Sequence, residues 1–212
     1  MESVINFLIE PYRTAETYMI ILEITAAALG ILSVWFSRME NILVYPTGII
    51  STGIYVYLLN IYELRGDMVI NAYFFVMSIY GWHNWTRETK GTTSLVKITR
   101  TNFKEKLIGV FIFIGGIFFV FFAYKIFNTK ITYITYTDAF TTAIFFVAMW
   151  YMALKKIENW TLWIAGNIVS IPLYLVKGLG FTAIQYTVFL ILAILGYIEW
   201  KKRLKMENLN KA

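Results

Sequence analysis

Two tryptophans and an asparagine in the second half of the chain form a W-x-x-W-x-x-x-N pattern, as Trp160, Trp163 and Asn167. At about 100° per residue these side chains share one face of a helix, and Ser170 and Tyr174 extend the same stripe. Indoles offer flat faces to an aromatic or cationic ring, and a carboxamide at membrane depth is costly unless a partner hydrogen-bonds to it. The stripe therefore predicts a binding site.

Two structural interpretations of the same residues stay open. Trp160 is at the start of an apolar segment, where tryptophan also serves as an interface anchor in membrane proteins. Asn167 lies about 13 Å further along a helix from Glu158, close to the middle of a bilayer, and there an amide also links helices by a hydrogen bond.

Polar and aromatic side chains at helical spacing occur on three further apolar segments. Such stripes pack helices together more often than they bind ligands, but here they include amides, which are expensive to bury without a partner. The further candidates for substrate binding are Thr52, Asn71, Phe75, Ser78, Trp82 and Gln185.

Two acidic residues are expected near one membrane surface, Glu23 and Asp138. Ionisable groups at membrane depth are expensive and mark function by default, although acids near the end of a span are also hydrated at the interface. We predict that both belong to the outer mouth of a path or to its gating.

Few residues are available for catalysis or metal binding. The chain has no Cys and a single His83, which excludes disulfides, a thiolate nucleophile and a His-rich metal cluster. No pair of acids is expected close together at depth. We predict no enzyme activity, no catalytic residue, no metal and no cofactor; a membrane-embedded enzyme and a sensor without transport are the minor alternatives.

The composition places the chain in a membrane. Of 212 residues, 58% are hydrophobic and 15% are charged, and the mean hydropathy is +0.61, which is more apolar than a soluble domain of this length. Windows of roughly 20 residues predict an all-α membrane protein with seven transmembrane helices. They are expected at about 18–36, 42–60, 68–86, 107–126, 138–154, 160–177 and 181–199.

The distribution of basic residues sets the expected orientation. With the N-terminus outside and the C-terminus inside, most of the 19 Lys and Arg lie on the cytoplasmic side, as the positive-inside rule requires. The net charge of +6 then follows from topology, so that no nucleic-acid partner is needed. We expect an interfacial lead-in at 1–17, a basic cytoplasmic loop at 87–106 and a basic cytoplasmic tail at 201–212.

An internal repeat relates the two halves of the chain. Adding 115 to the residue number takes Glu23 to Asp138 and Trp85 to Trp200, whereas an offset of 118 aligns Glu40-Asn41 with Glu158-Asn159. The repeat predicts two three-helix units, 18–86 and 138–200, joined by a connecting helix at 107–126 in a 3+1+3 arrangement. Parallel repeats of this kind place a substrate site between the halves near the bilayer midplane.

The motifs together resemble the PnuC family of bacterial vitamin transporters. The resemblance rests on Glu158-Asn159-Trp160-Thr161-Leu162-Trp163 with Asn167, and on the Gly-aromatic motifs that end at Trp85 and Trp200. It implies a full-length SWEET-like fold, a homotrimer in the bacterial cytoplasmic (inner) membrane, and facilitated diffusion of nicotinamide riboside. It also implies that a cytoplasmic kinase phosphorylates the imported vitamin and so traps it.

The choice among vitamins stays open at this point. Nicotinamide riboside has a pyridinium ring, a carboxamide and a sugar, which suit indole faces, amides and hydroxyls. Thiamine also has a cationic ring, and related members are similar in fold but carry other B vitamins, so a thiamine transporter is the alternative. The deep parts of the predicted spans lack Lys and Arg, which argues against a phosphorylated substrate.

Overall fold

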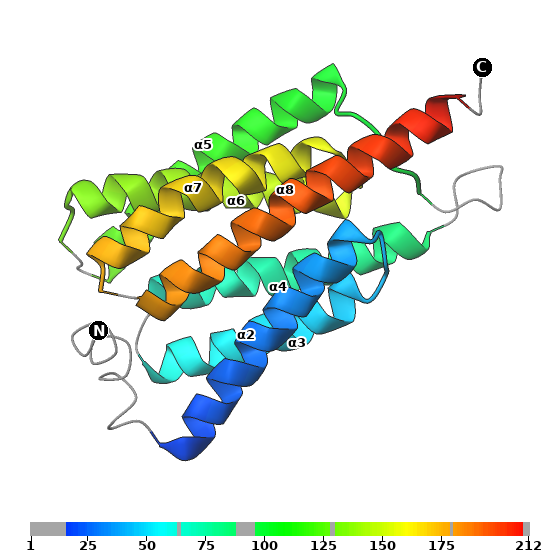
Figure 1. Cartoon of the computed structure of the whole chain (residues 1–212). Helices are drawn as coiled ribbons and strands as arrows, with labels where there is room; N and C mark the ends of the chain where they lie inside the picture. The colour runs from blue at the N-terminus through cyan, green and yellow to red at the C-terminus, as the bar shows by residue number, and fades with distance from the viewer. Residues whose placement is uncertain (1–15, 63–64, 88–95, 128–129, 179, 210–212) are drawn as a thin grey trace.

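The computed structural model describes residues 16–62, 65–87, 96–127, 130–178 and 180–209. In these residues the regular secondary structure is helical, apart from one isolated β-bridge. Figure 1 shows helices packed side by side along a common direction. The helices are α2 (Thr17–Arg38), α3 (Val44–Ile61), α4 (Arg65–Thr86), α5 (Phe103–Ile126), α6 (Tyr133–Ala153), α7 (Glu158–Val176) and α8 (Gly180–Leu209). The seven helices of the described residues confirm the predicted all-α fold.

The predicted helix bounds agree with the structure to within a few residues, except at the C-terminal end. Residues 201–209 of the predicted tail continue α8 as helix. Most of the predicted lead-in at 1–17 and residues 88–95 of the predicted loop lie outside the described residues.

Four of the described helices are long and apolar enough by themselves to cross a membrane: α2, α3, α5 and α8. The other three have 22, 21 and 19 residues, which is also sufficient to span a hydrocarbon layer about 30 Å thick. These three helices are less apolar. For α6 the structure gives the reason, because α6 packs against α4, α5 and α7. Because protein surrounds α6, it buries Thr135, Thr141 and Thr142 instead of presenting apolar side chains to lipid.

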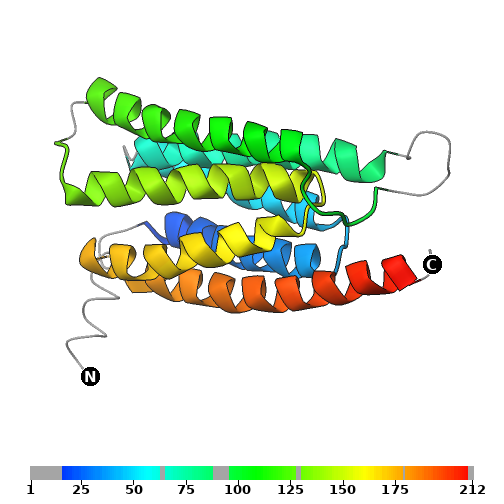
Figure 2. The same ribbon diagram turned by 90° about the horizontal axis from the view of Figure 1, so that it is seen from above.

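Six helices form a closed ring in which each packs on the next. The order around the ring is α2, α3, α4, α6, α7, α8 and back to α2, while α5 packs chiefly on α6. Figure 2 shows α5 at one edge of the bundle and α8 at the opposite edge. We call α2–α4 the first unit and α6–α8 the second unit. They meet through α2 with α8 and α4 with α6, which fits the predicted 3+1+3 arrangement.

The first and second helices of each unit are joined by the same turn. Glu40 and Lys155 both have a left-handed backbone, with φ of 60° and 53°. In each turn the next amide reaches back to the last helical turn, Asn41 N to Phe36 O and Lys156 N to Tyr151 O, both at 2.9 Å. This is the Schellman ending of a helix, which normally favours glycine at the left-handed position. The two turns correspond at an offset of 115.

The ring packing beyond the turns keeps this offset. Tyr45 meets Trp85 edge-on at 5.1 Å, and the equivalent Trp160 meets Trp200 edge-on at 5.6 Å. Deeper in the bundle, Gly30 faces Ser51, and at the equivalent positions Gly166 faces Phe145. The predicted change of offset to 118 is therefore wrong. Turn geometry, and not the shared Glu-Asn dipeptide, relates the halves.

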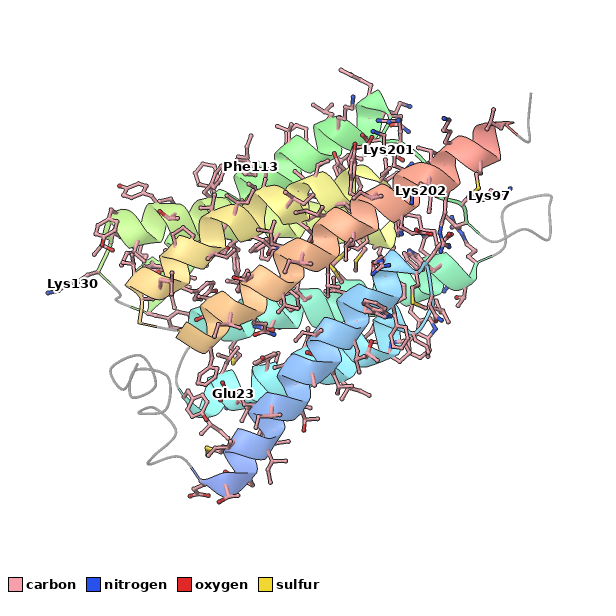
Figure 3. All side chains as sticks on the ribbon, viewed as in Figure 1. Glu23, Lys97, Phe113, Lys130, Lys201 and Lys202 are labelled. Atoms are coloured by element: carbon pink, nitrogen blue, oxygen red, sulfur yellow. The ribbon has the colours of Figure 1, made fainter. Side chains whose placement is uncertain are left out.

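Basic side chains gather at one end of the bundle. Figure 3 shows Lys97, Lys201 and Lys202 at the end that holds the α2–α3 and α6–α7 turns, and Lys130 and Glu23 toward the other end. The connection before α5 is fastened to the basic end, because Thr99 pairs with the α6–α7 turn through Thr99 N to Lys155 O (3.1 Å) and Ile157 N to Thr99 O (3.0 Å). We refer to this end as the basic end.

Candidate functional site

Trp160, the first member of the predicted stripe, is part of the packed core at the basic end. Its ring is 1% exposed and lies against Trp200. Gly196 on α8 is required here, because a Cβ at that position would overlap the Trp160 ring. The Trp160 indole Nε1 has no hydrogen-bond partner among the described residues. The surroundings of Trp160 are thus those of a packing residue.

Trp163 lies one turn further along α7 among aromatic rings. It stacks on Phe145 of α6, with ring centroids 5.1 Å apart and planes at 27°, and it also contacts Phe74 of α4 at 6.2 Å. Gly166 presses on the Phe145 ring from the next turn of α7, since a side chain there would collide with it. Helices α4, α6 and α7 thus form an aromatic wall around Trp163.

Asn167 and Ser170 follow on the same face of α7. Their unpartnered polar atoms lie beside the aromatic wall, whereas those of Ser37, Tyr45, Asn159 and Trp160 lie at the basic end. Asn167 and Ser170 are each 1% exposed. The Asn167 Oδ1 and the Ser170 Oγ have no hydrogen-bond partner among the described residues. A buried polar atom without a partner costs about 1–3 kcal/mol, so two in succession are expensive. They are suited to hydrogen-bond a polar molecule that enters the ring of helices.

Tyr174 extends the stripe towards the other end and pairs with a residue that sequence reasoning missed. Its ring stacks on Tyr186 of α8, with ring centroids 4.8 Å apart and planes at 23°. Tyr186 also contacts Phe145 at 5.9 Å, so that it connects Tyr174 to the aromatic wall. Tyr186 could have been found by extending the Gly196-Trp200 face of α8 backwards at helical spacing.

The two predicted acids take part in networks at the end opposite the basic end. Asp138 accepts from Lys177 Nζ at 2.5 and 2.7 Å and from the Tyr124 hydroxyl at 2.9 Å. Lys177 also lies 5.2 Å from the Tyr174 ring centroid. Glu23 interacts electrostatically with Tyr55 of α3. Gln185 of α8 reaches α2 of the first unit, because a Cβ placed on Gly30 would lie 3.9 Å from its Nε2.

The remaining candidates lie on α3 and α4, and two of them hydrogen-bond within their own helix. Thr52 Oγ1 donates to Gly48 O at 2.7 Å, and Asn71 Nδ2 donates to Asp67 O at 2.9 Å. Ser78 is buried at 3%, whereas Trp82 is 41% exposed on the surface of α4.

Phe75 packs on Gly53 and lines an open apolar pocket of about 630 Å³ between α2, α3 and α4. The structure does not bring Phe75 and Trp82 together with the α7 stripe.

The 115-residue offset shows how unlike the two units are at the depth of the site. Phe145, Trp163 and Asn167 of the second unit correspond to Gly30, Gly48 and Thr52 of the first. Two large rings and an amide thus stand where the first unit has two glycines and a threonine. The candidate binding groups therefore lie mainly on the second unit.

Comparison with known proteins identifies the architecture. The sequence profile described as nicotinamide mononucleotide transporter matches residues 20–202. The chain belongs to this family. It is a transporter and not an enzyme, and the resemblance inferred from its motifs is confirmed. Among the described residues no group of three or more His, Asp or Glu side chains is placed to hold a metal ion.

Three relatives align with most of the length of this chain. The nicotinamide riboside transporters PnuC of Escherichia coli and Neisseria mucosa are 23% and 28% identical, and the matches cover 84% and 86% of this chain and 84% and 73% of theirs. The riboflavin/roseoflavin transporter RibM of Streptomyces davaonensis is 23% identical over 69% of this chain and 68% of its own. A crystal structure of the vitamin B3 transporter PnuC superimposes with a TM-score of 0.68 and 26% identity, covering 87% of this chain and 82% of that one.

Proposed function

We propose that this transporter carries nicotinamide riboside across the membrane by facilitated diffusion. The observation that carries the proposal is the pair of unpartnered polar atoms, Asn167 Oδ1 and Ser170 Oγ, beside the aromatic wall at Trp163. A pyridinium ring suits the aromatic faces, and a carboxamide and ribose hydroxyls supply the hydrogen bonds that Asn167 and Ser170 lack. The relatives described as nicotinamide riboside transporters favour the same substrate.

The charge of the stripe favours the riboside over a phosphorylated substrate. Residues 163–174 contain no Lys, Arg or His, and a phosphate group in a dry site would need such a partner. The same residues contain no Asp or Glu, so the stripe offers no carboxylate to bind a coupling cation. Uniport is the simplest mechanism for such a path.

The direction of net uptake follows from the proposed orientation and from metabolism. The basic end is proposed to face the cytoplasm of a bacterial inner membrane, with the N-terminus outside, because Lys and Arg accumulate on that side. A cytoplasmic kinase that phosphorylates the vitamin would remove free riboside and keep the gradient inward. A homotrimer is proposed on family resemblance, and native mass spectrometry of the purified protein would test it.

Uptake into proteoliposomes tests the proposal. Labelled nicotinamide riboside should equilibrate with the vesicle interior, and uptake should be abolished in Asn167→Ala but unaffected when ion gradients are collapsed. Equal uptake by Asn167→Ala would remove Asn167 from the site, and dependence on a gradient would exclude uniport.

A second candidate is transport of another vitamin by the same fold. The match to a riboflavin/roseoflavin transporter favours this possibility, and thiamine has a cationic ring that suits the same wall. Competition decides between them: unlabelled riboside should block uptake of labelled riboside at lower concentrations than thiamine or riboflavin. The reverse order would select the other vitamin.

A further inference from the structure

We propose that Glu40 and Lys155, together with Trp85 and Trp200, form a latch that closes the transport path at the basic end and separates when substrate leaves. This inference rests on the proposed transport function. The latch consists of contacts between the first and second units, and its members occupy matching positions in the two halves of the chain.

The ion pair joins the two left-handed turns. Lys155 Nζ lies 2.8 Å from Glu40 Oε1, and the Lys155 and Glu40 side chains are 5% and 23% exposed. Because positions 40 and 155 are equivalent in the repeat, the two charges meet where the halves face each other. The Lys155 ammonium also lies 4.5 Å from the Trp85 ring centroid, and Arg203 Nη1 lies 3.2 Å from Glu40 Oε2. All three interactions cross between units.

Two indole hydrogen bonds cross between the units in a reciprocal manner. Trp85 Nε1 of the first unit donates to Met152 O of the second at 3.1 Å, and Trp200 Nε1 of the second donates to Ser37 O of the first at 3.0 Å. Donors and acceptors are both related by the offset of 115. Two equivalent hydrogen bonds from an indole to a backbone carbonyl therefore join the two units.

The latch fills the basic end of the ring of helices. Trp85, Trp160 and Trp200 are at most 2% exposed, as is Tyr45. Together with Met152 they form one hydrophobic cluster that takes side chains from α3, α4, α6, α7 and α8. A path that runs through the ring is closed at this end in this structure, so that release towards the basic side requires these groups to part.

Both carbonyl acceptors of the latch keep a hydrogen bond when it opens. Met152 O also accepts from Lys155 N, and Ser37 O from Glu40 N, both at 3.0 Å. Each carbonyl thus keeps a partner within its own turn when the indole leaves, which avoids the cost of a stranded acceptor. The separated ion pair would be solvated by water that enters from the basic side.

Thiol labelling tests the latch without relying on transport. The chain contains no cysteine, so that Ser170→Cys gives a single reporter next to the site. In inverted membrane vesicles, which expose the inner face, a membrane-impermeant thiol reagent should label this reporter slowly. Adding Glu40→Gln weakens a largely buried ion pair and should raise the labelling rate by about tenfold or more.

The matched control is Glu199→Gln. Glu199 pairs with the same Arg203 at 3.2 Å, but both residues lie on α8, so this change should leave the labelling rate at that of the parent. If Glu40→Gln labels no faster than Glu199→Gln, the latch is overturned.

A second measurement covers the case in which Glu40→Gln folds poorly. In Glu40→Cys/Lys155→Cys, a short bis-methanethiosulfonate linker should stop riboside flux, and a reductant should restore it. Flux that continues at the unlinked rate would make this region a fixed pivot and overturn the proposal. If the unmodified protein does not transport the riboside, the proposed function fails, while the labelling comparison still decides the latch.

Discussion

Replacing Asn167 by leucine should weaken ligand binding without destabilising the protein. The Asn167 Oδ1 is buried and lacks a partner among the described residues, which costs about 1–3 kcal/mol. Leucine has the same branched skeleton with four heavy side-chain atoms, and it removes that cost. The melting temperature of Asn167→Leu in detergent should therefore equal or exceed that of the parent.

Asn84 provides the matched control, because it is a buried amide with a partner. Its Nδ2 donates to Ala153 O at 2.9 Å, linking α4 to α6. Asn84→Leu loses that bond and should cost about 1–2 kcal/mol. At roughly 2–4 °C per kcal/mol for a chain of this length, its melting temperature should fall by about 2–8 °C.

The same thermal assay measures binding. At a riboside concentration 100 times the dissociation constant, the parent gains about 2.7 kcal/mol. A variant that binds tenfold more weakly gains about 1.4 kcal/mol at that concentration, so the ligand-induced shift of Asn167→Leu should be about half as large or less. The reasoning is refuted if Asn167→Leu melts as low as Asn84→Leu, since Asn167 would then have a structural partner.

Two further predictions concern the wall and the outer network. Gly166→Ala would push the Phe145 ring away from its stacking position and should weaken riboside binding by about tenfold. The control is Gly115→Ala, which has open space around it and should bind riboside with the affinity of the parent in the same titration. Equal affinities of the two variants would show that the aromatic wall adapts to the added methyl group. Lys177→Met leaves Asp138 without its cation and should destabilise the protein by about 1–2 kcal/mol. Adding Asp138→Asn should recover most of that loss in thermal unfolding, and simple additivity of the two changes would contradict the pairing.

Hydropathy predicted the helices well because polar turns separate the apolar segments, including those of α4, α6 and α7, which are less apolar than the other four. It could not predict which helix lies inside the bundle. The burial of α6 depends on its three neighbours, α4, α5 and α7. The sequence of α6 alone does not show which helices pack against it.

The repeat was predicted correctly at its ends and wrongly at its centre. The Glu40-Asn41 dipeptide matches Glu158-Asn159 in sequence. In the structure, however, Glu40 is equivalent to Lys155, and Glu40 and Lys155 form an ion pair. Residues that meet across a pseudo-two-fold axis need complementary charges rather than identical ones. Sequence identity was therefore a misleading guide at this turn, while the shared backbone geometry was a reliable one.

The α7 stripe could be predicted because helical periodicity places its side chains on one face. Periodicity did not separate Trp160, which packs against Trp200, from Trp163, which stacks on Phe145. It also missed Phe145 and Tyr186, because contacts between different helices do not follow from the spacing within any one of them.

A structure of the protein with nicotinamide riboside bound tests the central claim most directly. The account predicts the pyridinium ring beside Trp163, with polar groups of the ligand within hydrogen-bonding distance of the Asn167 Oδ1 and the Ser170 Oγ. A ligand bound elsewhere, with these two atoms still unpartnered, would contradict it.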